Sequence, residues 1–276
     1  MNNDEKDAVA AWLTKHGYPF ELHVGEVLRS GGWSVEHSKV YSDVTTAKTR
    51  EIDIRASYWT SDRNNGASIS VELIIECKRS IGKPWVAFRA PTVSGWLDTL
   101  YPNFNDRLSF LVRNEALVQE VHLPPFMRQP PELAHGIVRA MSDSKTGDPT
   151  APYAAVQGAL TAAIALGKHN EELLKYRGSA GAWDTAHVSL PTVVVDGSLY
   201  DYTLDSNDVP QLRAVPSIGV TAAHPENGSI ASVVIVTKEA WPSYVEQLTK
   251  QAHEFESSML PHVPSICTKI YGSREP

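Results

Sequence analysis

The sequence predicts a single α/β domain over all 276 residues, with a mixed central sheet flanked by helices. Three observations support this fold class. Apolar residues recur at helical spacing in the segments 20–29, 153–174 and 238–259. Short β-prone apolar runs, bounded by turn-forming residues, alternate with these helices. A hydrophobic content of 42% is enough to bury a sizeable core.

The first 80 residues are expected to form helices followed by a strand-rich segment. A short helix over 8–16 ends at Gly17, which can supply a left-handed cap, and Pro19 begins a second helix over 20–29. Polar turns then connect three strands, expected at 33–41, 50–59 and 69–78.

The middle of the chain, about 80–150, is expected to be an insertion that follows the third strand. Its proline pairs favour loops and short pieces, and 108–112 is expected to be a strand. Residues 151–276 are expected to complete the same domain. In that part, Asp196-Gly197 has the signature of a hairpin turn. The expected elements are a helix at 153–174, strands at 191–195, 199–204 and 230–236, and a last helix at 238–259.

Composition limits the classes of function. The chain has 32 acidic and 25 basic residues, whereas a purely electrostatic nucleic-acid binder would be basic overall, so any such contact needs a local patch. The two cysteines, Cys77 and Cys267, form neither a disulfide framework nor a zinc motif. The N-terminus has no apolar signal core, and no run of about 20 apolar residues could span a bilayer. We expect a cytoplasmic protein with no membrane partner.

Two short apolar strands carry acidic residues where a buried strand should carry none. Asp53 lies in the segment 50–54, and Glu76 ends the run 71–76. Because side chains alternate along a strand, Glu76 and Lys78 point to the same face. If the two strands are neighbours, Asp53 joins them. A buried carboxylate must be neutralised, paired or bound to a metal, so this group predicts a metal site beside an amine.

Carboxylate oxygens select hard cations, and Mg²⁺ typically takes one or two carboxylates together with water and phosphate oxygens. Such an ion polarises a phosphate and activates a bound water. Lys78 could orient that water, or accept its proton if burial lowers the pKa of the amine. On the preceding helix, Glu21 lies at the edge of the apolar arc and Glu26 on the opposite side, so Glu21 is expected to face the site, where it could complete the metal shell or hold a second ion.

Other interpretations apply to several of these residues. Glu76 and Lys78 could form a surface ion pair on an edge strand, but the apolar residues before them favour a buried strand. Glu51 and Glu72 share strand faces with Asp53 and Glu76, and each is expected to pair with an arginine or lysine in preference to a ligand role.

The order of helix with Glu21, hairpin with Asp53, and Glu76-Cys77-Lys78 resembles the PD-(D/E)xK nuclease superfamily, which has the restriction-endonuclease-like fold. The resemblance covers about residues 17–80, and Ile52 stands where many members have proline. It implies that Asp53 and Glu76 bind the ion together with the Cys77 backbone carbonyl, that Lys78 is the catalytic lysine, and that Glu21 assists. It also implies Mg²⁺ as cofactor, replaceable by Mn²⁺, and a weaker role for Gln157 on a later helix.

Cationic residues near these strands could contact phosphate groups. Trp85 and Phe88 lie among them and could stack on bases, although packing within the insertion explains both equally well. The cations are Lys39, Lys48, Arg50, Arg79, Lys83 and Arg89.

No glycine-rich phosphate loop and no G-x-S-x-G motif is present, which argues against an NTPase or a serine hydrolase.

The sequence therefore predicts a Mg²⁺-dependent nuclease that hydrolyses phosphodiester bonds, with DNA as the expected substrate. The resemblance extends to bacterial proteins that cleave foreign DNA, which implies a role in defence. Two alternatives stay open: a binding module for nucleic acid or protein on the same fold, and an enzyme that cleaves RNA. Because the chain is acidic, we expect weak intrinsic binding and dependence on a homo-oligomer, a regulatory protein partner or a trigger.

Overall fold

The computed structural model describes residues 3–15, 17–62, 66–89, 133–141, 148–176, 184–223 and 230–264. The helices are α1 (Asn3–Lys15), α2 (Tyr18–Ser30), α5 (Ala151–Tyr176) and α6 (Trp241–Met259), followed by a 3-10 turn (Leu260–His262). The strands are β1 (Ser34–Ser42), β2 (Thr49–Asp62), β3 (Ala67–Arg79), β4 (Trp85–Arg89), β5 (Leu133–Arg139), β6 (Asp184–Asp196), β7 (Leu199–Leu204), β8 (Pro210–Ala214), β9 (Ser217–Ala223) and β10 (Ile230–Thr237).

All ten described strands belong to one mixed sheet, in the order β1-β2-β3-β6-β10-β9-β5-β4-β7-β8. The first three strands are antiparallel neighbours, while β3, β6 and β10 run parallel. The β3–β6 ladder is the longest, extending from Ala67–Asp184 to Arg79–Asp196. Together with the helices, this confirms the expected α/β class with a mixed central sheet.

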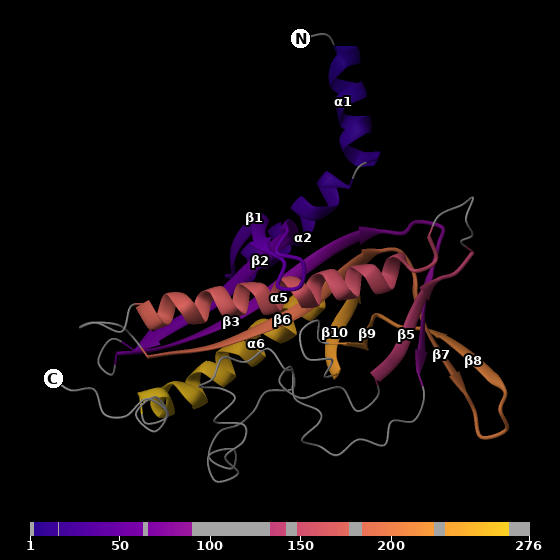
Figure 1. The fold of residues 1–276 in the computed structure, drawn as a ribbon. Coiled ribbons are helices and arrows are strands. Elements are labelled where there is room, and N and C mark those ends of the chain that lie inside the picture. Colours follow the sequence, from indigo (N-terminus) through magenta and orange to yellow (C-terminus); the bar gives the residue numbers. More distant parts are fainter. Residues whose placement is uncertain are drawn as a thin grey trace.

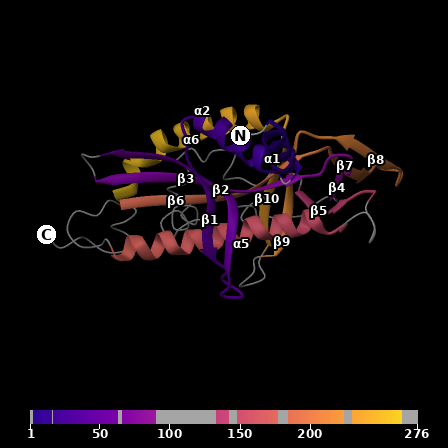
Figure 2. The ribbon, with the colours of Figure 1, turned by 90° about the horizontal axis from the view of Figure 1, so that it is seen from above.

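The helices cover the two faces of the sheet in three layers. Figures 1 and 2 show α2 and α6 on one face and α5 on the other. A large core cluster joins α2 and α6 to one face of β2, β3 and β6, and its members include Val24, Val71 and Phe255. On the opposite face, α5 approaches closely through small residues such as Ala159 and Ala163, as its alanine-rich sequence predicts. None of the helices in the described segments is long and apolar enough to cross a lipid bilayer.

The expected hairpin at Asp196-Gly197 is wrong. β7 does not pair with β6 but lies between β4 and β8. Gly197 has a different structural reason, because a Cβ atom there would lie 2.8 Å from the backbone oxygen of Ser80. The glycine thus allows two backbones to approach closely where β3 and β6 end.

Part of the segment expected to be an insertion belongs to the central sheet, since β4 and β5 are two of its strands. The strand expected at 108–112 lies outside the described residues. β8 and β9 were not expected. β8 is exposed along its whole length, so it lacks the alternation of apolar and polar residues that marks a half-buried strand.

One buried acid on α6 stands apart from every other charged group in the core. Glu256 is only 3% exposed, and within the described part of the chain its Oε1 atom has no hydrogen-bond partner. Burial raises the pKa of Glu256 from its ordinary value of 4.5 to about 8, because loss of hydration disfavours the charged carboxylate. At neutral pH the folded protein therefore holds this side chain mostly protonated.

We predict that Glu256 makes the protein less stable as the pH rises. The folded state keeps the proton up to a pKa of about 8, while the unfolded chain releases it near 4.5. Between these values the stability should fall by about 1.4 kcal/mol per pH unit on account of this group. The variant Glu256→Gln lacks this dependence, so urea unfolding should show it gaining on the wild type as the pH increases. A constant difference between the two proteins would contradict a neutral buried Glu256.

Candidate active site

The candidate site lies where β2 separates from β3. The ladder between these strands ends at the pair Ile54–Ile75. Immediately beyond it, Oδ2 of Asp53 accepts a hydrogen bond of 2.7 Å from the backbone N–H of Cys77. The carboxylate thus replaces a backbone acceptor at the end of the ladder and is held against β3.

β2 also bends sharply at Asp53. The side chains of Ile52 and Ile54 pack into different core clusters, although residues two apart on a regular strand share a face. On the other side of β2, Ser38 has a φ of 53°, and the regular pairing with β1 is interrupted between Ile54 and Ile52. Beyond this point the tip of the β1–β2 hairpin runs across the direction of β3 (Figure 2). The bend turns the Asp53 side chain toward the end of β3.

Glu76 and Lys78 share a face of β3, as the alternation of the strand predicts. Nζ of Lys78 donates a hydrogen bond to Oε1 of Glu76, and the two form an ion pair. The side chain of Glu76 is 16% exposed and that of Lys78 is 39% exposed, so the pair is accessible from one side only. The arrangement differs from an isolated surface pair because Asp53 lies beside it.

Three charged groups influence one another here. Burial raises the pKa of Asp53 and of Glu76, and the Lys78 ammonium opposes the rise in both. For Lys78, burial acts to lower the pKa, but attraction to Glu76 and Asp53 outweighs burial and raises it. One cation therefore faces two half-buried acids. The raised pKa favours a protonated Lys78, which suits the role of an orienting cation, and the role of proton acceptor stays a prediction.

Glu21, near the start of α2, belongs to the same electrostatic group. Burial and repulsion by the Asp53 carboxylate raise the pKa of Glu21, while Lys78 lowers it. Glu26, one turn further on, points to solvent and pairs with Arg29 at 3.4 Å. The helical arrangement thus separates the two acids as expected.

The donor atoms suit a hard divalent cation. Asp53 and Glu76 offer carboxylate oxygens, and burial destabilises both in the charged form that a bound cation would favour. Across the described ranges, no group of three or more His, Cys, Asp or Glu side chains is arranged to hold a metal ion. An ion here would therefore take two carboxylates and complete its shell with water and a backbone oxygen, for which Cys77 is the candidate.

A cationic group lies beside the acids, and of its members Arg79 was expected from the sequence whereas Asp196 and Lys238 were missed. Asp196, at the end of β6, pairs with Arg79 at 3.5 Å and with Lys238 at 3.3 Å. Lys238 also lies over the Phe20 ring of α2, 5.7 Å from its centroid. A Cβ atom placed on Gly17 would lie 3.8 Å from Cδ of Arg79 and 4.0 Å from Oε1 of Glu21, so both side chains pass close to Gly17. Only the parallel order of β3, β6 and β10 brings Asp196 and Lys238 here, and no local motif marks them.

The other expected nucleic-acid contacts are not gathered at the acids. Arg50 pairs with Asp43 at 2.5 Å at the tip of the β1–β2 hairpin, and the Gln157 amide donates to the hydroxyl of Tyr153 one turn away on α5. Trp85 is buried in β4 and donates to Ser80, so the packing interpretation is correct and base stacking by Trp85 is wrong. Phe88 makes an edge-to-face contact with Tyr202. Lys39 forms an ion pair with Glu36, and Arg89 forms one with Asp201. Lys48 is exposed and Lys83 is half-buried.

The two remaining acids behave as partners for cations or as surface groups. Glu72 is buried and pairs with Arg55, as expected, and His187 lies 3.7 Å from it. Glu51 is exposed, and its charge raises the pKa of both Asp53 and Glu21. Glu72 therefore belongs to the core of the protein, while Glu51 acts on the site through the electrostatic effect of its charge.

No protein-family model matches the chain, and neither a curated protein nor a solved structure matches it. The functional interpretation therefore depends on the chemistry of the candidate site and on the motif resemblance in the sequence.

We predict that replacing Lys78 changes the titration of all three acids. Because the ammonium lowers the pKa of Glu76, Asp53 and Glu21, the variant Lys78→Met should raise each of these pKa values. Carboxyl chemical shifts followed by NMR during a pH titration would measure the change. Lys83→Met is the matched control, since Lys83 influences none of the three. An unchanged pKa of Glu76 would contradict the arrangement.

Proposed function

We propose that this protein is a Mg²⁺-dependent endonuclease that hydrolyses DNA phosphodiester bonds, on a fold of the restriction-endonuclease type. The observation that carries the proposal is the convergence of Asp53, Glu76 and Lys78 where β2 leaves β3, with Glu21 coupled to them from α2. Two half-buried carboxylates beside a lysine are groups that suit metal-assisted phosphodiester hydrolysis.

Each residue then has a distinct task. Asp53, Glu76 and the Cys77 carbonyl would hold the ion, which when bound supplies Lewis-acid polarisation of the phosphate and a more acidic water. Lys78, whose pKa is raised, orients the attacking water or a phosphate oxygen as a cation and stabilises the negative charge of the transition state. Burial and the Asp53 carboxylate raise the pKa of Glu21, which adds a further polar group at the edge of the site.

The cations Arg79 and Lys238 give this acidic protein a local means of contacting the nucleic-acid backbone. Both pair with the carboxylate of Asp196 beside the acids. Arginine and lysine at such positions bind phosphate oxygens without reading the base sequence. A role in bacterial defence against foreign DNA follows from the resemblance to the PD-(D/E)xK nucleases and belongs to the same proposal.

The proposal predicts metal-dependent nicking of plasmid DNA. With Mg²⁺ or Mn²⁺, Asp53→Ala and Lys78→Ala should each lose at least about a hundredfold in rate, because each removes a group that acts on the reacting phosphate. Glu254→Ala, an exposed acid on α6, is the control and should keep wild-type activity. Equal activity in all the proteins would rule out this site. A parallel assay on single-stranded RNA tests the RNA alternative.

A non-catalytic binding module is the second candidate function. It is favoured by the pairing of the acids within the protein, since Asp53 accepts from the Cys77 amide and Glu76 pairs with Lys78. Calorimetry separates the two candidates. A nuclease should show Mg²⁺-linked heat that disappears in Asp53→Ala, whereas a binding module should show the same heat, or none, in both proteins.

A further inference from the structure

The N-terminal helix presents apolar side chains to solvent. In Figure 1, α1 projects away from the three layers of the fold. Among the described residues, thirteen large hydrophobic side chains are exposed, and five of them lie between positions 9 and 22. They are Val9 (51% exposed), Trp12 (52%), Leu13 (36%), Tyr18 (48%) and Leu22 (59%), and Trp12 stacks on Tyr18.

A helix in this position needs a packing surface. Isolated helices shorter than about 12–15 residues are marginal in water, and most helical stability in proteins comes from burying an apolar face. α1 has 13 residues, and all its described side chains are exposed. It is joined to α2 through Gly17, whose φ of 90° directs the two helices along different lines. The apolar face of α1 therefore suits a surface on another molecule.

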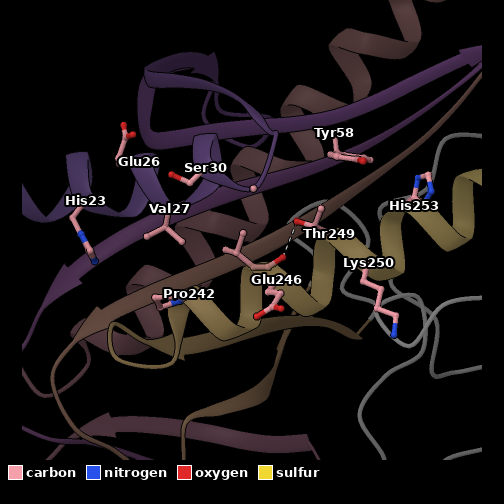
Figure 3. A pocket seen from close by; sticks show the side chains of 12 residues that line it. His23, Glu26, Val27, Ser30, Tyr58, Pro242, Glu246, Thr249, Lys250 and His253 are labelled. Atoms are coloured by element: carbon pink, nitrogen blue, oxygen red, sulfur yellow. Dashed lines mark hydrogen bonds between the residues drawn. The ribbon is translucent and has the colours of Figure 1, made fainter.

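The same protein carries a groove of about 800 Å³ between α2 and α6, with β2 at its end (Figure 3). Val27, Tyr58 and Val245 contribute apolar surface to it, and Gly31 lets α2 approach α6, because a Cβ atom there would lie 3.1 Å from Val245. The polar rim includes Glu26 on α2 and Glu246, Lys250 and His253 on α6. This groove, called the α2–α6 groove below, contains none of the candidate catalytic residues.

We propose that α1 of one copy of this chain occupies the α2–α6 groove of a second copy, so that two copies form a dimer by reciprocal exchange of their N-terminal helices. An exchange in which each copy both gives a helix and receives one closes with two-fold symmetry. Each contact would cover the exposed side chains of α1 with the apolar wall of the partner's groove.

Length and charge both fit this occupant. α1 is about 20 Å long, and the part of α6 that lines the groove, residues 242–253, extends for about 18 Å. The first turn of α1 is acidic, with Asp4 and Glu5, while Lys250 and His253 mark one end of the groove. The acidic turn can therefore lie beside Lys250, with Val9 and Leu13 over the apolar wall of the groove.

The experiment measures mass by analytical ultracentrifugation over a dilution series. The full-length chain of 30.3 kDa should sediment as a dimer that dissociates on dilution. The arm variant Val9→Asp/Leu13→Asp and the groove variant Ser30→Arg/Lys250→Glu alter exposed residues only, so both should fold as the wild type does by circular dichroism. Each should weaken dimerisation at least about tenfold, the size of effect that burial of one large apolar side chain has. The arm variant loses that burial, and the groove variant prevents it by placing a bulky arginine in the groove and reversing the charge at position 250.

Mixing the two variants gives the decisive result. The arm variant keeps an intact groove and the groove variant keeps an intact arm, so a mixture retains one good contact per pair and should dimerise more strongly than either variant alone. Leu212→Asp, which replaces a leucine on β8 that is 59% exposed, is the control and should leave the dimer unchanged.

Several results would overturn the proposal. They are a wild-type chain that stays monomeric throughout the series, a dimer that survives both variants, loss of the dimer in the arm variant alone, and a mixture no stronger than its components. Loss in the arm variant alone would mean that α1 packs against α1. None of these residues belongs to the candidate active site, so the outcome is independent of the nuclease assay.

Discussion

The hydrogen bond from the Cys77 amide to the Asp53 carboxylate is the contact on which the candidate site depends. It lies at the first position where β2 no longer pairs with β3 through its backbone. An amide at the end of a ladder needs an acceptor, and an acid is the side chain that accepts most strongly. The same contact orients Asp53 beside Glu76. One hydrogen bond thus gives the Cys77 amide an acceptor and positions Asp53 in the candidate site.

The sheet places the charged groups of the site on both of its faces. Cys77 packs with α2 and α6, whereas Glu76 and Lys78 point to the α5 side by strand alternation. A continuous sheet would keep these faces apart. Because β2 bends away at Asp53, the sheet opens there, and Glu21 on α2 influences acids on the neighbouring strands. The bend therefore makes one site from residues of two layers.

Much of this arrangement could be predicted from the sequence because it is local. Strand alternation placed Glu76 with Lys78, and helical geometry separated Glu21 from Glu26, and both relations hold in the structure. The parts that could not be predicted depend on long-range strand order. Lys238 reaches Asp196 and Arg79 only because β10, β6 and β3 are adjacent, and Gly197 was misinterpreted because its constraint comes from Ser80, far away in the chain.

The β3–β6 ladder has a consequence for the order in which the protein folds. Its two strands pair residues such as Ala67 and Asp184, about 117 positions apart, whereas β1, β2 and β3 are joined by short turns. Closing a long loop costs conformational entropy before the contacts that it permits can form. The hairpin strands that carry Asp53 and Glu76 can therefore assemble early, but their burial waits for β6. The slowest step of folding is expected to be the docking of this central strand.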